Sequence, residues 1–235
     1  EVVTPILKWD DMDTLQAAVR ELRKAGAKTP ECTSQHVHIG VRDFNARQIA
    51  NFARIFYKQE ELLLKAAGTL QRRIDSYTRR TDREFIARLE KAKPTTREGL
   101  NKAWFGYSNP NPAHYDSMRY HAINLNNVWR TGTVEVRAFN GTTHAGEVKS
   151  HIVLCLAIAA LAKNAKCAST KNQRPFCAES AKYDMRVFLL RLGLIGPEFK
   201  NVRMHLLKHL PGNTAWKCPQ DTRRSAADGG SAHRR

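Results

Sequence analysis

Apolar and polar residues alternate along one stretch near the middle of the chain, residues 132–142. Successive side chains of a strand point to opposite faces, so Val134 and Val136 would lie on one face and Glu135 and Arg137 on the other. The alternation predicts a strand that presents a carboxylate beside a guanidinium, while its other face is apolar.

Residues 35–41 repeat the pattern, with apolar side chains on one face and His36 and His38 on the other. If both strands belong to one sheet, one face carries a hydrophobic core. The opposite face then carries two imidazoles, a carboxylate and a guanidinium. That set can hold a divalent metal and a phosphate together, which indicates an enzyme.

Helical periodicity dominates the remainder of the chain. Apolar residues recur at helical spacing, between capping residues and terminating glycines, in several segments. The predicted helices span residues 11–25, 45–67, 95–106, 143–163, 179–192 and 197–210, with Asn45 and Thr143 as two of the caps. Further strands are predicted at residues 1–7 and 119–125. This order predicts an α+β fold with a curved, mainly antiparallel sheet and helices packed on one face.

The segment 71–93 is rich in arginine and has two interpretations. One is a solvated helix face with ion pairs. The other is that a few of these arginines reach a phosphate or a carboxylate in a cleft. The arginines are Arg72, Arg73, Arg79, Arg80, Arg83 and Arg88.

The formal net charge of +17 over 235 residues is the unusual feature of the composition. It allows nucleic acid, a nucleotide, an anionic peptide or an acidic surface as a partner.

The five cysteines are widely spaced and odd in number, which suits a reducing compartment. The longest apolar run, residues 152–162, is shorter than the roughly 20 residues of a membrane span. We therefore expect a cytoplasmic protein without a membrane partner. Its folded domain would span residues 1–216, followed by a disordered basic tail at 217–235.

Each motif alone also has an ordinary structural explanation. A His-x-His strand often makes only local hydrogen bonds, and a Glu-x-Arg pair can be a surface ion pair that contributes little stability. Asn140-Gly141 is first of all a turn signal. Arg119 and Asn124 could be a packing arginine and a turn residue. The hypothesis gains weight because the polar residues share strands that are otherwise apolar.

Several of these motifs together resemble a known family. The chain resembles the bacterial and phage amidoligases, a branch of the glutamine synthetase and glutamate–cysteine ligase superfamily of carboxylate–amine ligases. The likeness covers residues 1–216 and rests on residues 2–7, His36–Gly40, Arg119–Asn124, Thr133–Thr142 and Phe188–Lys200. It implies a glutamine synthetase-like catalytic fold.

The resemblance also implies roles for individual residues. His36, Glu135 and Glu1 would be ligands of Mg²⁺ or Mn²⁺. His38 and Asn140 would contact the nucleotide, and Arg137 would hold the transferred phosphoryl group. Arg119 would be a second clamp for a phosphate or a carboxylate.

The implied reaction joins a carboxylate to an amine at the expense of ATP, through an acyl-phosphate. Its substrates would be small molecules, peptides or a protein. Family members carry an earlier strand with a Glu-x-Glu pair, which this sequence lacks. We therefore expect an N-terminally incomplete domain whose metal site is one acid short. A truncated, non-catalytic domain and a basic nucleic-acid-binding protein are the alternatives; a metal-dependent phosphoesterase is a weaker third.

Overall fold

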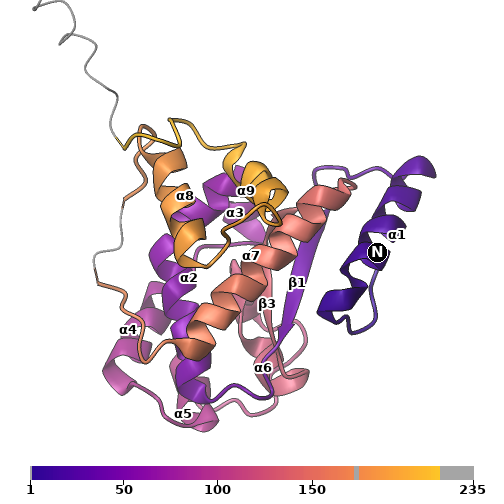
Figure 1. Cartoon of the computed structure of the whole chain (residues 1–235). Helices are drawn as coiled ribbons and strands as arrows, with labels where there is room; N and C mark the ends of the chain where they lie inside the picture. The colour runs from indigo at the N-terminus through magenta and orange to yellow at the C-terminus, as the bar shows by residue number, and fades with distance from the viewer. Residues whose placement is uncertain (1, 172–174, 218–235) are drawn as a thin grey trace, which may run out of the picture.

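The strands of the computed structural model form one antiparallel sheet in the order β1–β3–β2 within the described residues, 2–171 and 175–217 (Figure 1). The strands are β1 (Ser34–Gly40), β2 (Ile123–Asn124) and β3 (Thr133–Asn140). β3 lies in the centre and pairs with β1 on one side and β2 on the other. The α+β class and the antiparallel pairing predicted from the sequence are confirmed.

Helices make up most of the remaining chain, and two short 3-10 turns accompany them. The turns are η1 (Trp9–Asp11) and η2 (Ser117–Tyr120). The helices are α1 (Met12–Lys24), α2 (Ala46–Ala66), α3 (Gln71–Ser76), α4 (Arg83–Ala92), α5 (Arg97–Phe105), α6 (Asn126–Arg130), α7 (Ala145–Asn164), α8 (Ala181–Arg191) and α9 (Lys200–Leu207). The Asn45 cap of α2 is confirmed, because its side chain accepts a hydrogen bond from the Gln48 amide at 3.0 Å.

The long helices α2 and α7 pack against each other, and α7 crosses the sheet in front of β1 and β3 (Figure 1). The apolar side chains of β1 and β3, including Val37, Ile39, Val134 and Val136, are buried in the core beneath these helices. The alternation in the sequence therefore orients both strands correctly. The core is apolar and lies on the helical side of the sheet.

A β-bulge interrupts the pairing of β1 with β3. Gln35 pairs with Phe139, but Val37 pairs with Val136, so β3 contains one more residue than β1 between these points. Arg137 and Ala138 of β3 therefore lie opposite His36. A bulge bends the strand and redirects side chains, and bulges are common beside functional sites.

Beside the bulge, side chains rather than an extension of β2 form hydrogen bonds with the backbone carbonyls of β3. The Ala138 carbonyl accepts a hydrogen bond from Thr69 Oγ1 at 2.6 Å, and the Arg137 carbonyl accepts one from Thr78 Oγ1 at 3.0 Å. Arg73 donates to the carbonyls of both Arg137 and Phe139. These groups satisfy backbone acceptors that a strand would otherwise pair with. β2 can therefore be only two residues long.

Helix α7 is long and apolar enough to cross a membrane by length and composition alone. In the structure it packs against α1, α2, α9 and β1, and more than half of its apolar window is buried. These contacts are those of a core helix, as the sequence pattern predicted for this segment.

Three local predictions are wrong. Residues 2–7 form no strand: their side chains are exposed, and they pair with no strand edge in the described structure. The strand predicted at 119–125 is reduced to β2, because η2 occupies its first two residues. The cap of α7 is His144 rather than Thr143. Glu1 and residues 218–235, which make up nearly all of the predicted tail, lie outside the described residues.

Candidate active site

Glu135 is the centre of the polar side of the sheet. In the strand register it lies directly opposite His38 of β1 and directly opposite Asn124 of β2. Paired residues of antiparallel strands project to the same face, so the three side chains form a row across the sheet. Glu135 is only 2% exposed, which is rare for a carboxylate without partners.

Both oxygens of the Glu135 carboxylate are occupied by polar groups. Oε1 lies 2.7 Å from Arg137 Nη1, 3.1 Å from His36 Nδ1 and 3.8 Å from His38 Nε2. Oε2 accepts hydrogen bonds from the side-chain amides of Asn124 at 2.6 Å and Asn127 at 3.0 Å. The structure therefore brings together the two imidazoles, the carboxylate and the guanidinium that the two sequence patterns presented.

The electrostatics of this cluster fix its charge state. Burial by itself raises the pKa of Glu135, but the neighbouring polar groups, with the charge of Arg137 first among them, outweigh burial and hold that pKa below its ordinary value. Burial, together with the positive charge of Arg137, lowers the pKa of His36 well below its ordinary value. At neutral pH the carboxylate is ionised and the His36 ring is neutral. Nδ1 of the ring faces Glu135 and Nε2 lies 3.0 Å from Ser34 Oγ, so one nitrogen carries the proton and the other carries the lone pair.

Arg137 is buried and mainly holds Glu135 in place. Besides its bond to the carboxylate, its Nε donates to the Tyr77 carbonyl at 3.2 Å, and its guanidinium lies 5.9 Å from the Tyr120 ring centroid. Its predicted role as a phosphoryl clamp stays a prediction.

Arg119 packs against Tyr120, the same ring that Arg137 contacts. Its guanidinium is 5.6 Å from the Tyr120 ring centroid and 5.3 Å from that of Tyr115, and its Nη1 donates to the His114 carbonyl at 2.8 Å. Its Nε is buried and has no hydrogen-bond partner among the described residues. Arg119 and Arg137 therefore share Tyr120 as a common neighbour, and Arg119 retains a donor that is unsatisfied.

Asn140 is placed differently from the other predicted site residues. Its amide nitrogen donates to the Gly68 carbonyl at 2.7 Å, and its oxygen accepts from the Leu70 amide and from Arg73, both at 3.3 Å. The side chain thus fastens the end of β3 to the turn between α2 and α3. Its role in nucleotide binding stays a prediction, as does the role of Glu1, which lies outside the described residues.

The two asparagines on Glu135 Oε2 were not predicted as site residues. Asn124 belonged to the Arg119–Asn124 motif of the family resemblance, with a turn residue as its ordinary explanation, and Asn127 on α6 carried no motif. The available signal was their spacing, because an asparagine at the end of a strand and another three residues later can converge on one acceptor. They orient the carboxylate, as outer groups commonly do for the ligands of a metal.

Most ion pairs of the arginine-rich segment are with acidic residues outside the sheet site. Its ion pairs join Arg72 to Glu31, Arg80 to Glu61, and Arg88 to both Asp82 and Glu84. The exception to the solvated pattern is Arg73, which is 4% exposed and binds the carbonyls of β3. Burial, with Arg137 nearby, lowers the pKa of Arg73 to about 10. Through Arg73, the segment contributes hydrogen bonds to the bulged end of β3.

Fold and site together define an α+β protein with a His-, Glu- and Arg-lined sheet. The chain matches the family model described as "Putative amidoligase enzyme" over residues 1–159, more than half of its length. It therefore belongs to this amidoligase family, as the sequence motifs predicted, and the family supports a ligase. No curated protein and no solved structure matched the chain.

Proposed function

We propose that the protein is an ATP- and metal-dependent carboxylate–amine ligase that acts through an acyl-phosphate, on a glutamine synthetase-like fold. The observation that carries the proposal is the convergence of His36, His38 and Arg137 on Oε1 of the buried Glu135. A carboxylate has a poor leaving group, so amide formation requires its activation by ATP. Ser34 Oγ lies 3.0 Å from Nε2 of His36, but an acyl-phosphate route requires no protein nucleophile.

The donor set suits a divalent ion that also binds the phosphates of a nucleotide. Mg²⁺ is usually bound by one or two protein carboxylates, with phosphate oxygens and water completing its shell. Glu135 supplies one such carboxylate, and the imidazole of His36, whose Nδ1 lies 3.1 Å from Oε1, is the neighbouring group that could act as a nitrogen ligand. A bound Mg²⁺ or Mn²⁺ would neutralise phosphate charge. The two asparagines on Oε2 would keep the carboxylate oriented toward the ion.

The remaining residues would bind and orient the substrates. His38 is the more exposed histidine of the site, at 46% of its side chain, and can reach the phosphates. Arg119 carries a buried donor that has no partner in the part of the chain that the structure describes, and it would bind a phosphate or the substrate carboxylate. Arg137 holds Glu135 and would stabilise negative charge on the transferred phosphoryl group. The high positive charge favours an acidic carboxylate substrate, either a small molecule or part of a peptide or protein.

The test is the melting temperature with and without Mg-ATP in the wild type and in Glu135→Gln. A ligand at about 100 times its Kd stabilises a fold by about 2.7 kcal/mol. For a chain of this size that corresponds to about 5–10 °C. We expect this shift in the wild type and its loss in the variant, because the amide cannot supply the charge that the ion requires.

Glu98→Gln is the matched control, because it removes the same charge from an exposed residue paired with Lys102. It should keep the full shift. Equal shifts in all three proteins would overturn the assignment of nucleotide and metal to Glu135. Without a shift in any of them, the chain would be a non-catalytic domain, and tight salt-dependent DNA binding insensitive to Glu135 would favour the nucleic-acid alternative.

A further inference from the structure

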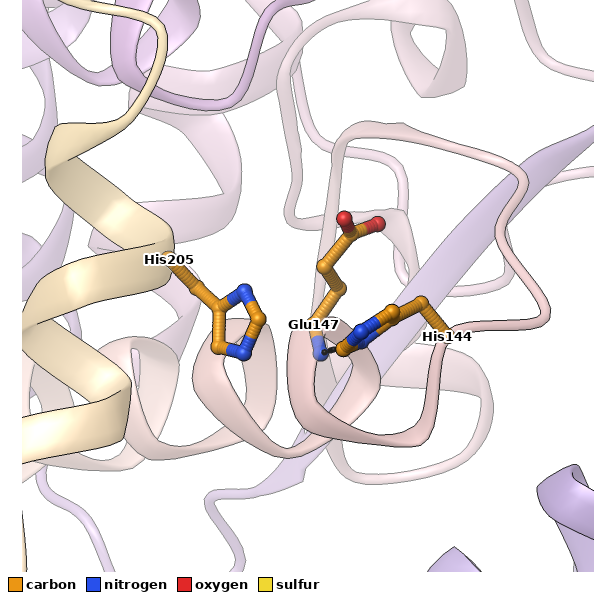
Figure 2. A group of neighbouring side chains, drawn as sticks. All are labelled: His144, Glu147 and His205. Atoms are coloured by element: carbon orange, nitrogen blue, oxygen red, sulfur yellow. Dashed lines mark hydrogen bonds between the residues drawn. The ribbon is translucent and has the colours of Figure 1, made fainter.

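A second group of metal-binding side chains lies where β3 runs into α7, outside the sheet site. His144, Glu147 and His205 each offer one ligand atom, and these atoms lie within 4.8 Å of one another. Figure 2 shows the His205 ring on α9 and the His144 ring on either side of the first turn of α7, which carries Glu147. Two imidazoles and a carboxylate from two separate elements thus meet at one place.

The two histidine rings are close and face each other edge to face. Their centroids are 4.9 Å apart and their planes are inclined by 62°. His144 is the cap of α7, and its Nδ1 accepts a long hydrogen bond, 3.3 Å, from the Glu147 amide. This weak bond is the contact that a metal ion at Nδ1 would replace.

Gly146 provides the space that both rings occupy. A Cβ atom at this position would lie 2.6 Å from His205 Nε2, which would force that ring to move, and 3.1 Å from His144 Cε1, which would press on the second ring. Its backbone is helical, where alanine is favoured over glycine by about 0.5–1 kcal/mol. The glycine is therefore explained by the room it leaves between the two imidazoles.

The Glu147 carboxylate is already oriented and already neutralised by a cation. Its Oε2 accepts a hydrogen bond from Thr142 Oγ1 at 2.7 Å, and its Oε1 forms an ion pair with the Lys208 ammonium. Thr142 resembles the outer groups that orient ligating carboxylates. Lys208 is exposed on a flexible stem and can leave without disturbing the core.

We propose that His144, Glu147 and His205 bind a transition-metal ion of the Zn²⁺ class, which takes the place of the Lys208 ammonium. Two nitrogen donors and one carboxylate suit Zn²⁺ rather than Mg²⁺, which prefers oxygen ligands throughout. Tetrahedral bonds of about 2.0–2.1 Å place neighbouring donors about 3.4 Å apart, so donor atoms that lie as far as 4.8 Å apart need to approach by up to about 1.4 Å. A fourth position remains for water.

This site shares no side chain with the proposed nucleotide site. His205 lies beyond residues 1–159, the part that matches the family, whereas the candidate active site lies within it. The ion would join α9 to the start of α7, two elements that already pack together. It would act as a clamp on the C-terminal part of the domain.

The experiment is a titration with Zn²⁺ alone by calorimetry, and with Co²⁺ alone by visible absorption. Both use the full chain carrying Glu135→Gln, so that the sheet site lacks its carboxylate. We expect one equivalent of metal and the absorption bands of four-coordinate Co²⁺. His205→Gln should weaken the binding at least tenfold, and Gly146→Ala should do the same by displacing the rings. His114→Gln, at an exposed histidine elsewhere, is the control and should bind normally.

Lys208→Gln separates a metal site from a merely structural cluster. Removing the competing ammonium should tighten Zn²⁺ binding several-fold, whereas a structural ion pair predicts no change in metal affinity. The proposal is overturned if His205→Gln binds Zn²⁺ as tightly as His114→Gln while both remain folded. It is also overturned if the Glu135→Gln background binds no Zn²⁺.

Discussion

Burial of an ionised carboxylate is costly unless its oxygens are paired, and Glu135 shows how the chain satisfies this requirement. The charge of Arg137 compensates one oxygen, and two neutral amides solvate the other. The ionised form is therefore stable at a position that is almost inaccessible to water. A ligand that binds Oε1 competes with the Arg137 guanidinium, whereas Oε2 stays held by the two asparagine amides.

His151 provides a pH prediction at the level of one side chain. Its ring stacks on Phe139 with centroids 4.1 Å apart, and its Nδ1 lies 2.8 Å from Gln35 Oε1. Burial lowers its pKa from 6.5 to about 4. Between these values the unfolded chain binds a proton that the folded chain does not, so stability is complete above pH 6.5 and falls as the pH approaches 4.

The measurement is urea unfolding of the wild type and His151→Gln from pH 7 to pH 4. The lowered pKa of His151 corresponds to roughly 3 kcal/mol in the free energy of unfolding. The wild type should lose this free energy between pH 7 and pH 4, and the variant should not. Other histidines with lowered pKa values contribute in the same direction to both proteins and cancel in the comparison. They are His36, His121, His205 and His209. Parallel stability curves would contradict the assignment.

Alternation alone predicted which residues would share the polar face. Because side-chain direction on a strand has a period of two, His36, His38, Glu135 and Arg137 could be placed without knowledge of the fold. The partners of Oε2 could not be placed in this way, since Asn127 reaches the carboxylate from a short helix. The His205 cluster was missed for a similar reason: α9 meets α7 only through tertiary packing.

At the level of elements, helices were predicted more accurately than strands. Capping residues and apolar spacing are local signals, and α2, α5 and α7 each begin within a few residues of the predicted start. A strand also requires a partner edge. Residues 2–7 have strand-like composition but pair with nothing in the described structure, and η2 shortens the strand that ends in β2.

Arg73 gives the prediction at this scale. Its side chain crosses from α3 to the bulged end of β3 and donates to two backbone carbonyls, as well as to Thr78 Oγ1. Arg73→Met would leave the Phe139 carbonyl without this donor, in a region closed to water. We expect a loss of about 3 kcal/mol in the free energy of unfolding, measured by urea titration.

The neighbouring Arg72 supplies the control. It is half exposed and pairs with Glu31 on the surface, so Arg72→Met should change the free energy of unfolding by no more than about 0.5 kcal/mol. Equal losses in the two variants would show that Arg73 contributes only its charge. Arg73→Lys should recover little stability, because an ammonium cannot reach several acceptors in the geometry of a guanidinium.

For the whole molecule, the question is which environment surrounds α7. Ile158 is 1% exposed and faces the core, whereas Leu156 is 38% exposed on the same helix. In a folded domain, Ile158→Lys should cost more than about 4 kcal/mol or abolish folding, since it buries an unpaired charge. Leu156→Lys should cost less than about 1 kcal/mol.

Thermal melts of the two purified variants provide the measurement. In a membrane-spanning helix, a lysine at either position would lie at similar depth and be similarly costly. A large difference between the variants therefore supports the core arrangement. Equal and severe losses would contradict it.

The central position of β3 has a consequence for the order in which the molecule forms. Its contacts with β2 are local, as in the bond from Asn124 to Glu135 across 11 residues, whereas its contacts with β1 are distant, as in the side-chain hydrogen bond between His38 and Thr133 across 95 residues. Closing the longer loop costs more chain entropy, and distant pairings slow folding. The β2–β3 unit should therefore form first and leave one edge of β3 unpaired until β1 arrives. During that interval the nascent chain is most prone to aggregate, and the late docking of β1 completes the candidate active site.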